Sequence, residues 1–135
     1  MRSRPLHRLH AILLAGTVPL FIGVLLTDLA YAQSYEIQWK NFASWLIAGG
    51  LVFSGVALLW GLIVLLRAES RRGAPMVYFL ALLAGWILGF INALIHAKDA
   101  WASMPEAVIL SVLTLALILL ATWLGFVTPR PGATT

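Results

Sequence analysis

The chain alternates four long apolar stretches with short polar connections. The stretches cover residues of about 11–31, 43–66, 76–95 and 107–127. An α-helix of about 20 apolar residues crosses a hydrocarbon core of about 30 Å. The pattern therefore predicts an all-α fold, an antiparallel four-helix transmembrane bundle. It forms a single domain over residues 1–135, with spans at about 8–31, 42–66, 75–97 and 104–127.

The composition excludes a water-soluble protein. Of the 135 residues, 61% are hydrophobic, and the mean hydropathy is +0.95. A soluble domain of this size could not bury that many apolar side chains. The sequence contains no cysteine, which excludes disulfides, thiolate chemistry and covalent c-type haem within this chain.

The charged residues divide unequally between the two sides that alternating spans produce. Seven arginines and the single acid Glu69 fall on one side. The other side receives two lysines and four acids, namely Lys40, Lys98, Asp28, Glu36, Asp99 and Glu106. By the positive-inside rule, both termini and the middle loop are expected in the cytoplasm. We expect a multi-pass protein of the bacterial inner membrane, and the lipid bilayer, not nucleic acid, as the partner of its basic residues.

The first apolar stretch also has features of a secretory signal peptide. Arginines precede it, and Ala30-Tyr31-Ala32 has the form of a cleavage site. The apolar run is longer than the 7–15 residues typical of a signal peptide, and it contains Pro19 and ends near Asp28. We expect the segment to be kept as a span. Cleavage, which would leave three spans, is the alternative.

Small residues recur at every fourth position of the third stretch. They are Ala81, Gly85, Gly89 and Ala93, and the middle pair forms a GxxxG motif. Such a strip lets another helix approach closely, which favours helix association in lipid. We interpret these four residues as a helix-packing face. The hydroxyl residues within the spans, Thr17, Ser54, Ser111 and Thr114, are interpreted as packing groups too.

Polar residues gather at the acidic end of the third stretch. Asn92, His96 and Asp99 share one face if the helix continues that far, and Asp28 and Trp101 are expected at similar depth. Polar groups inside a bilayer are candidates for function. A carboxylate beside His96 would fix its tautomer and form a proton or ligand site. An interfacial network that only holds helix ends together is the alternative.

Cofactor and metal sites receive little support from the spacing. His7 and His10 share a helical face, but the arginines around them favour a lipid-headgroup patch over a metal site. His10 and His96 lie at opposite ends of their spans, too far apart to ligate one haem b. A quinone site formed by His96, Asp28 and Trp101 stays open. No nucleophile–base arrangement or phosphate-binding motif is present, so we expect no enzyme and no metal.

Three segments together resemble a known family. They are Trp45–Leu51 in the second stretch, Asn92–Trp101 after the third, and Thr122–Gly125 in the fourth. With the Arg-Pro-Leu-His start, they resemble the bacterial predicted membrane proteins called domain of unknown function 2231. The resemblance implies a four-helix integral membrane domain with no established activity. Such domains are sometimes joined to, or encoded beside, redox modules such as Rieske or cytochrome c domains.

Three functions agree with these observations. The first is a non-enzymatic membrane subunit or anchor, which binds a partner through its outer rim or the small-residue face. The second is a redox-associated subunit that binds haem b or quinone near His96. The third is a subunit of an oligomeric transporter, which would require a homo-oligomer because four short helices with few polar groups enclose no wet path.

Overall fold

A computed structural model describes residues 7–67 and 73–127. Within them the chain forms four long helices and one short 3₁₀ helix, η1. Their bounds are α1 Arg8–Ser34, α2 Ile37–Arg67, α3 Ala74–His96, η1 Ala100–Ser103 and α4 Glu106–Val127. All four long helices have the length and apolarity needed to cross a membrane. The predicted all-α fold with four membrane-spanning helices is confirmed.

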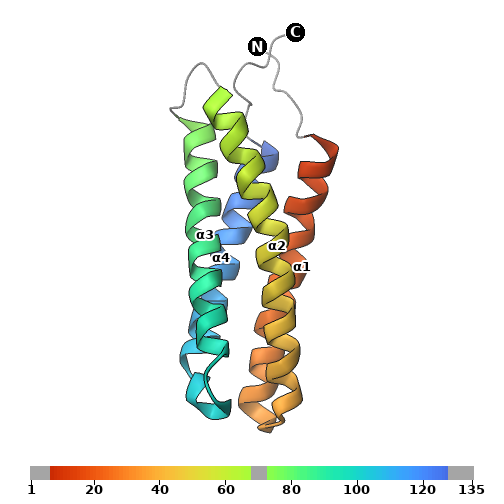
Figure 1. Ribbon diagram of the computed structural model, residues 1–135, viewed down its shortest axis with the longest axis vertical. Helices are drawn as coiled ribbons and strands as arrows, with labels where there is room; N and C mark the ends of the chain where they lie inside the picture. Colours follow the sequence, from red (N-terminus) through yellow and green to blue (C-terminus); the bar gives the residue numbers. More distant parts are fainter. Residues whose placement is uncertain (1–6, 68–72, 128–135) are drawn as a thin grey trace.

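The four helices form an up-down-up-down bundle (Figure 1). Each helix packs against its neighbour in the chain, and α1 also packs against α4. The helices therefore occupy the corners of a square, with α1 diagonal to α3 and α2 diagonal to α4. We call the end with Tyr35–Glu36 and residues 97–105 the hairpin end. The opposite end, where α1 begins near Arg8 and α2 stops at Arg67, is the basic end.

Two helices begin elsewhere than the hydrophobic pattern predicts. The second helix begins at Ile37, not near residue 42, and so includes Lys40, which is buried and donates to the backbone carbonyl of Lys98. The connection to α1 is thus a two-residue turn in which Tyr35 has the left-handed φ of 61°. The fourth helix begins at Glu106, two positions later than predicted. Pro75 lies in the first turn of α3, where its missing N–H costs no hydrogen bond.

The buried positions follow the alternating four- and three-residue spacing of left-handed helix bundles. In α1 they are Tyr31, near the end of the helix, and before it the series His10, Leu14, Thr17, Phe21, Val24 and Asp28. In α3 they are Tyr78, Leu82, Gly85, Gly89, Asn92 and His96. The two series match position by position with an offset of 68 residues, which is the separation of both hydrogen-bonded pairs between these helices. The diagonal helices α1 and α3 therefore run in register along the bundle.

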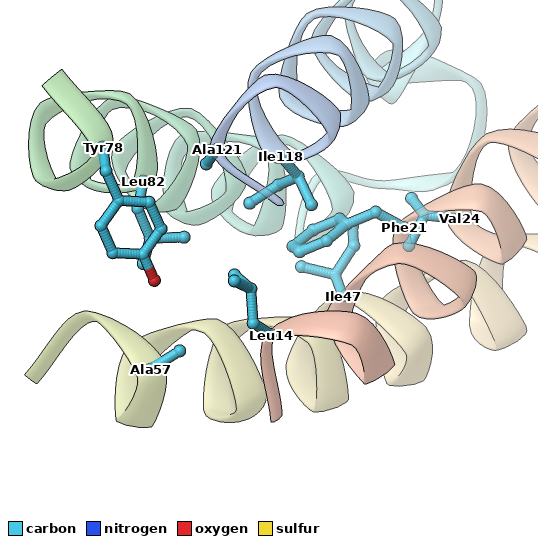
Figure 2. Packing of buried hydrophobic residues seen from close by; sticks show 9 residues of the cluster. All are labelled: Leu14, Phe21, Val24, Ile47, Ala57, Tyr78, Leu82, Ile118 and Ala121. Atoms are coloured by element: carbon cyan, nitrogen blue, oxygen red, sulfur yellow. The ribbon is translucent and has the colours of Figure 1, made fainter. Parts of the chain in front are cut away.

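Large side chains fill the centre where other helices supply glycine. Phe21 of α1 lies against Gly50 of α2 and Gly89 of α3, and a Cβ on Gly50 would come within 2.9 Å of its ring. Tyr78 of α3 lies in the same way against Gly61 and Gly125. Figure 2 shows Phe21 and Leu14 of α1 and Ile118 of α4 directed into the shared interior. The bundle is thus built in layers that pair one large residue with small partners.

The predicted small-residue face of α3 lies inside this bundle. Gly85 faces Ile118 and Leu117 of α4, and Gly89 faces Leu51 and Phe21. Ala81 and Ala93 are partly buried against the same core. The close approach that the strip permits is therefore between helices of one chain. A second protein could reach it only by displacing α1 or α4.

Candidate functional site

Four polar side chains from three helices form a buried hydrogen-bonded network at the hairpin end. His96 Nε2 lies 2.6 Å from Asp28 Oδ1. Ser111 donates its hydroxyl to Asp28 Oδ2 over 2.5 Å, and Asn92 Nδ2 donates to Ser111 Oγ over 2.9 Å. His96 Nδ1 lies 2.8 Å from the backbone oxygen of Asn92. We call Asp28, Asn92, His96 and Ser111 the polar network; all four are buried.

The heptad-like spacing of the helices places these groups together. Asp28 is the last position of the buried α1 series before Tyr31, and His96 is the matching position and the last residue of α3. Ser111 is buried five residues after the start of α4, about 8 Å along the helix axis. Asp28 and Ser111 therefore lie about one to two helical turns inside the hairpin end, whereas His96 is at the end of its helix. At this depth little water is available to satisfy polar groups, so they satisfy one another.

His96 and Asp28 have every polar atom engaged. Both ring nitrogens of His96 and both carboxylate oxygens of Asp28 have partners. Haem iron binds an imidazole nitrogen through its lone pair. Either nitrogen of His96 would have to give up its present partner to become such a ligand. Within the described residues no group of three or more His, Asp or Glu side chains is close enough to hold a metal ion.

Two buried polar atoms near the network lack a hydrogen bond within the described part of the chain. They are Asn92 Oδ1 and Thr114 Oγ1. Thr114 follows Ser111 by three positions on the buried face of α4. Unsatisfied buried acceptors are uncommon in folded proteins. Asn92 Oδ1 is thus an acceptor that the described residues leave unused.

Aromatic and basic side chains cover the network at the hairpin end. The ring of Trp101 in η1 lies 4.8 Å from Tyr35 and 5.9 Å from Tyr31, which is buried one turn beyond Asp28. Lys40 of α2 donates from its Nζ to the backbone oxygen of Lys98 after α3. A cation at this position also interacts favourably with the carboxyl end of a helix. These contacts tie the two connections of the hairpin end together.

Three of the five predicted site residues lie in the polar network, and two do not. Asp28, Asn92 and His96 meet. Asp99 does not join them because α3 ends at His96, and Asp99 is exposed in the connection. Trp101 packs on tyrosines, and no contact with His96 is seen.

Ser111 is the member that sequence reasoning missed. Ser111 was interpreted as a packing group, and besides lying buried between helices its hydroxyl binds the carboxylate of Asp28. A hydroxyl residue on the buried face of α4, at the depth of a buried acid and a histidine, was the available signal.

A second polar pair links the same two helices at the basic end. His10 Nε2 lies 2.9 Å from Tyr78 Oη, and the His10 ring stacks on Trp60 with centroids 5.6 Å apart. His10 is buried, so its predicted place in a lipid-headgroup patch was wrong. His7 is exposed and accepts from the backbone N–H of Leu9 as the N-cap of α1. Both pairs join α1 to α3 across the diagonal of the bundle.

The comparison with protein families identifies one match. A family model described as a predicted membrane protein, DUF2231, matches residues 6–128. No curated protein and no solved structure shows significant similarity to the chain. The family description agrees with four membrane-spanning helices and names no activity.

Proposed function

For a chain that belongs to the DUF2231 family of predicted membrane proteins, we propose the role of a non-enzymatic membrane subunit that binds a partner protein at its hairpin end. One observation carries this proposal. The polar groups inside the bundle are turned toward one another, whereas aromatic groups at the hairpin end are exposed and held in place.

The aromatic groups at the hairpin end form a platform of Tyr31, Tyr35 and Trp101. Tyr35 is 69% exposed and Trp101 47% exposed, although their ring centroids lie only 4.8 Å apart. The buried ring of Tyr31 packs against Trp101. The bond from Lys40 to the Lys98 carbonyl links α2 to the segment that precedes η1. Tyrosine and tryptophan are enriched at protein interfaces. A platform that is already ordered loses little conformational entropy on binding.

The other predicted roles receive less support from the geometry. Both nitrogens of His96 are engaged, which disfavours a haem ligand. Between the two polar pairs, the layer of Leu14, Ala57, Leu82 and Ala121 contains no polar side chain. A transported ion would meet this dry layer about one helical turn inside the pair of His10 and Tyr78. A quinone would have to compete with Asp28 for His96.

The orientation and location belong to the same proposal. The charge distribution favours a cytoplasmic basic end, and therefore a hairpin end on the periplasmic side of a bacterial inner membrane. The partner would then be a periplasmic protein, or a membrane protein with a periplasmic domain.

Photo-crosslinking in native membranes tests the proposed partner site. A benzophenone amino acid replaces Tyr35 or Trp101 at the hairpin end, and Trp123 serves as the control. Trp123 is 67% exposed and lies near the opposite end of α4. We expect an adduct of one defined mass from Tyr35 and Trp101 and none of that mass from Trp123. The adduct formed from position 35 should weaken when Trp101→Ala is added. Equal adducts at all three positions, or none at the hairpin end, would refute a partner site there.

A further inference from the structure

The backbone contact of His96 determines which of its nitrogens carries a proton. A carbonyl oxygen accepts hydrogen bonds and cannot donate them. Because His96 Nδ1 lies 2.8 Å from the Asn92 oxygen, Nδ1 must be the donor and must carry a proton. The second nitrogen, Nε2, faces Asp28 Oδ1 over 2.6 Å. This contact is a hydrogen bond if it contains one proton, which either Nε2 or Oδ1 carries while the other atom accepts.

Both positions of this proton satisfy the surrounding groups. If Nε2 carries it, an imidazolium donates to a carboxylate that also accepts from Ser111. If Oδ1 carries it, a carboxylic acid donates to a neutral imidazole, and Ser111 still donates to Oδ2. The 2.5 Å bond from Ser111 is in the range of a hydroxyl that donates to a carboxylate, and the 2.6 Å contact with His96 is shorter than ordinary N–H···O bonds, which supports the ion pair as the resting form. The proton belongs to the pair and not to either residue.

We propose that Asp28 and His96 form a proton-binding site that holds one shared proton, and that release of this proton breaks the link between α1 and α3 at the hairpin end. Release breaks the Nε2–H bond and transfers the proton to hydroxide from the aqueous phase. A carboxylate and a neutral imidazole are left. If the neutral imidazole keeps its proton on Nδ1, the lone pair of Nε2 faces the negative oxygen of Asp28. If the proton is on Nε2 instead, the lone pair of Nδ1 faces the carbonyl oxygen of Asn92. Either arrangement sets two acceptors against each other in a dry site.

Few other charges surround the shared proton. On α2 the ammonium group of Lys40 is directed to the Lys98 carbonyl. Beyond α3, Lys98 and Asp99 are exposed, and Glu36 and Glu106 on the neighbouring segments are exposed too. Tyr31 is the titratable group one turn further along α1. Among the described residues, Asp28 and His96 form the only ion pair. The site is therefore isolated from the charged surface.

The test follows the proton by NMR of the full-length protein in lipid nanodiscs with ¹⁵N-labelled histidine. The three histidines of the chain are assigned by His7→Gln and His10→Gln. The decisive variant is Asp28→Asn, whose amide can donate to Nε2 and accept from Ser111 without a shared proton. Ser111→Ala is the matched control, because it removes the other bond to Asp28 and leaves the pair intact. Nitroxide labels at Glu36→Cys and Asp99→Cys report the separation of the α1 and α3 ends.

In the wild type and in Ser111→Ala we expect His96 to keep both nitrogens bonded to protons at neutral pH. As the pH is raised, one more proton should be released per molecule than in Asp28→Asn, and the distribution of label distances should broaden at the pH at which His96 loses its proton. Asp28→Asn should show a neutral His96 throughout and no broadening. If Asp28→Asn does not fold, the ¹⁵N signals of His96 in the wild type and in Ser111→Ala still show directly whether one or both of its nitrogens carry a proton.

Three results would overturn the proposal. The first is a neutral His96 in the wild type with a deprotonated Asp28 at neutral pH. The second is retention of the proton until the protein unfolds, because the site would then not exchange. The third is release of the proton with an unchanged distance distribution. Each result is independent of whether a partner binds the aromatic platform.

Discussion

Asp28 and His96 are buried side by side, and their other hydrogen-bond partners are Ser111 and the backbone oxygen of Asn92. A buried pair of this kind adds little stability over apolar residues of equal volume, but the loss of one partner leaves the other uncompensated. Each single substitution should therefore lower the free energy of unfolding strongly, whereas the double substitution should lower it much less than the sum of the two.

Substitution of either partner should destabilise the bundle. We expect Asp28→Ala and His96→Ala each to lower the free energy of unfolding by about 3 kcal/mol, because each leaves a buried group without its partner. The double variant should lose clearly less than the sum of the two. Unfolding in mixed micelles with increasing dodecyl sulfate, followed by circular dichroism, measures these values. Asp99→Ala is the control and should leave stability unchanged, since Asp99 is exposed. Simple additivity of the two substitutions would contradict the pairing.

Part of this site could be predicted from the sequence. Asn92 and His96 are four positions apart and share a helical face wherever the helix ends, so that spacing predicts their proximity correctly. The exclusion of Asp99 depends on the helix stopping at His96, and no local residue pattern marks that stop. The contact between Ser111 and Asp28 depends on the register of α4 against α1, which spacing within one helix cannot reveal.

At the scale of helices, stability depends on which glycines face a large side chain. A Cβ on Gly125 would lie 2.7 Å from Leu14 Cδ2 and 2.9 Å from Tyr78 Cε2. Tyr78 cannot move away freely because its hydroxyl is bonded to His10. A Cβ on Gly49 would meet Leu20 at 3.7 Å, an ordinary contact. Glycines that look alike in the sequence therefore have different roles.

The two glycines should respond in opposite directions to alanine. Gly125→Ala should destabilise the protein by about 1–3 kcal/mol through overpacking. Gly49→Ala should be neutral or stabilising by up to about 1 kcal/mol, since alanine favours the helical conformation. The same unfolding measurement compares them. Equal effects of the two substitutions would show that Tyr78 and Leu14 can rearrange around an added methyl group.

Lys40 connects the start of α2 to the connection after α3. Lys40→Met keeps the apolar length of the side chain and removes the donor. We expect faster amide hydrogen exchange in residues 97–104 and little change in the helices, because only this connection loses its tie. Lys98→Met is the control, because the Lys98 side chain is exposed and its backbone oxygen is retained. The same increase in exchange in both variants would point to a general effect of charge.

At the scale of the whole molecule, the orientation in the membrane can be measured directly because the chain has no cysteine. Single cysteines at Glu36 and Asp99 should react with a membrane-impermeant maleimide added to intact spheroplasts. A cysteine at Arg67, at the basic end, should react only after permeabilisation. The reverse pattern would place the hairpin end in the cytoplasm. It would also move the proposed partner to that side.

The overall architecture could be predicted almost entirely, because spans of about 20 apolar residues leave few alternatives in a bilayer. The face that each helix turns inward could not. All four helices are apolar around most of their circumference, so periodicity barely separates the lipid side from the core. In the sequence, the small residues of α3 and the polar residues Asp28 and His96 each indicate the buried face of one helix. Which of these residues meet in one layer of the bundle depends on how the helices pack against one another.

The matched spacing of the two diagonal pairs limits changes in chain length. Asp28 follows His10 by 18 positions and His96 follows Tyr78 by 18, which is five full helical turns or about 27 Å. One residue inserted between His10 and Asp28 would rotate one end of α1 by about 100° relative to the other and detach one pair. Insertions in the Tyr35–Glu36 turn leave both pairs intact. A version of this protein for a thicker bilayer would therefore have to lengthen its helices outside the two pairs, or lengthen α1 and α3 together by whole turns.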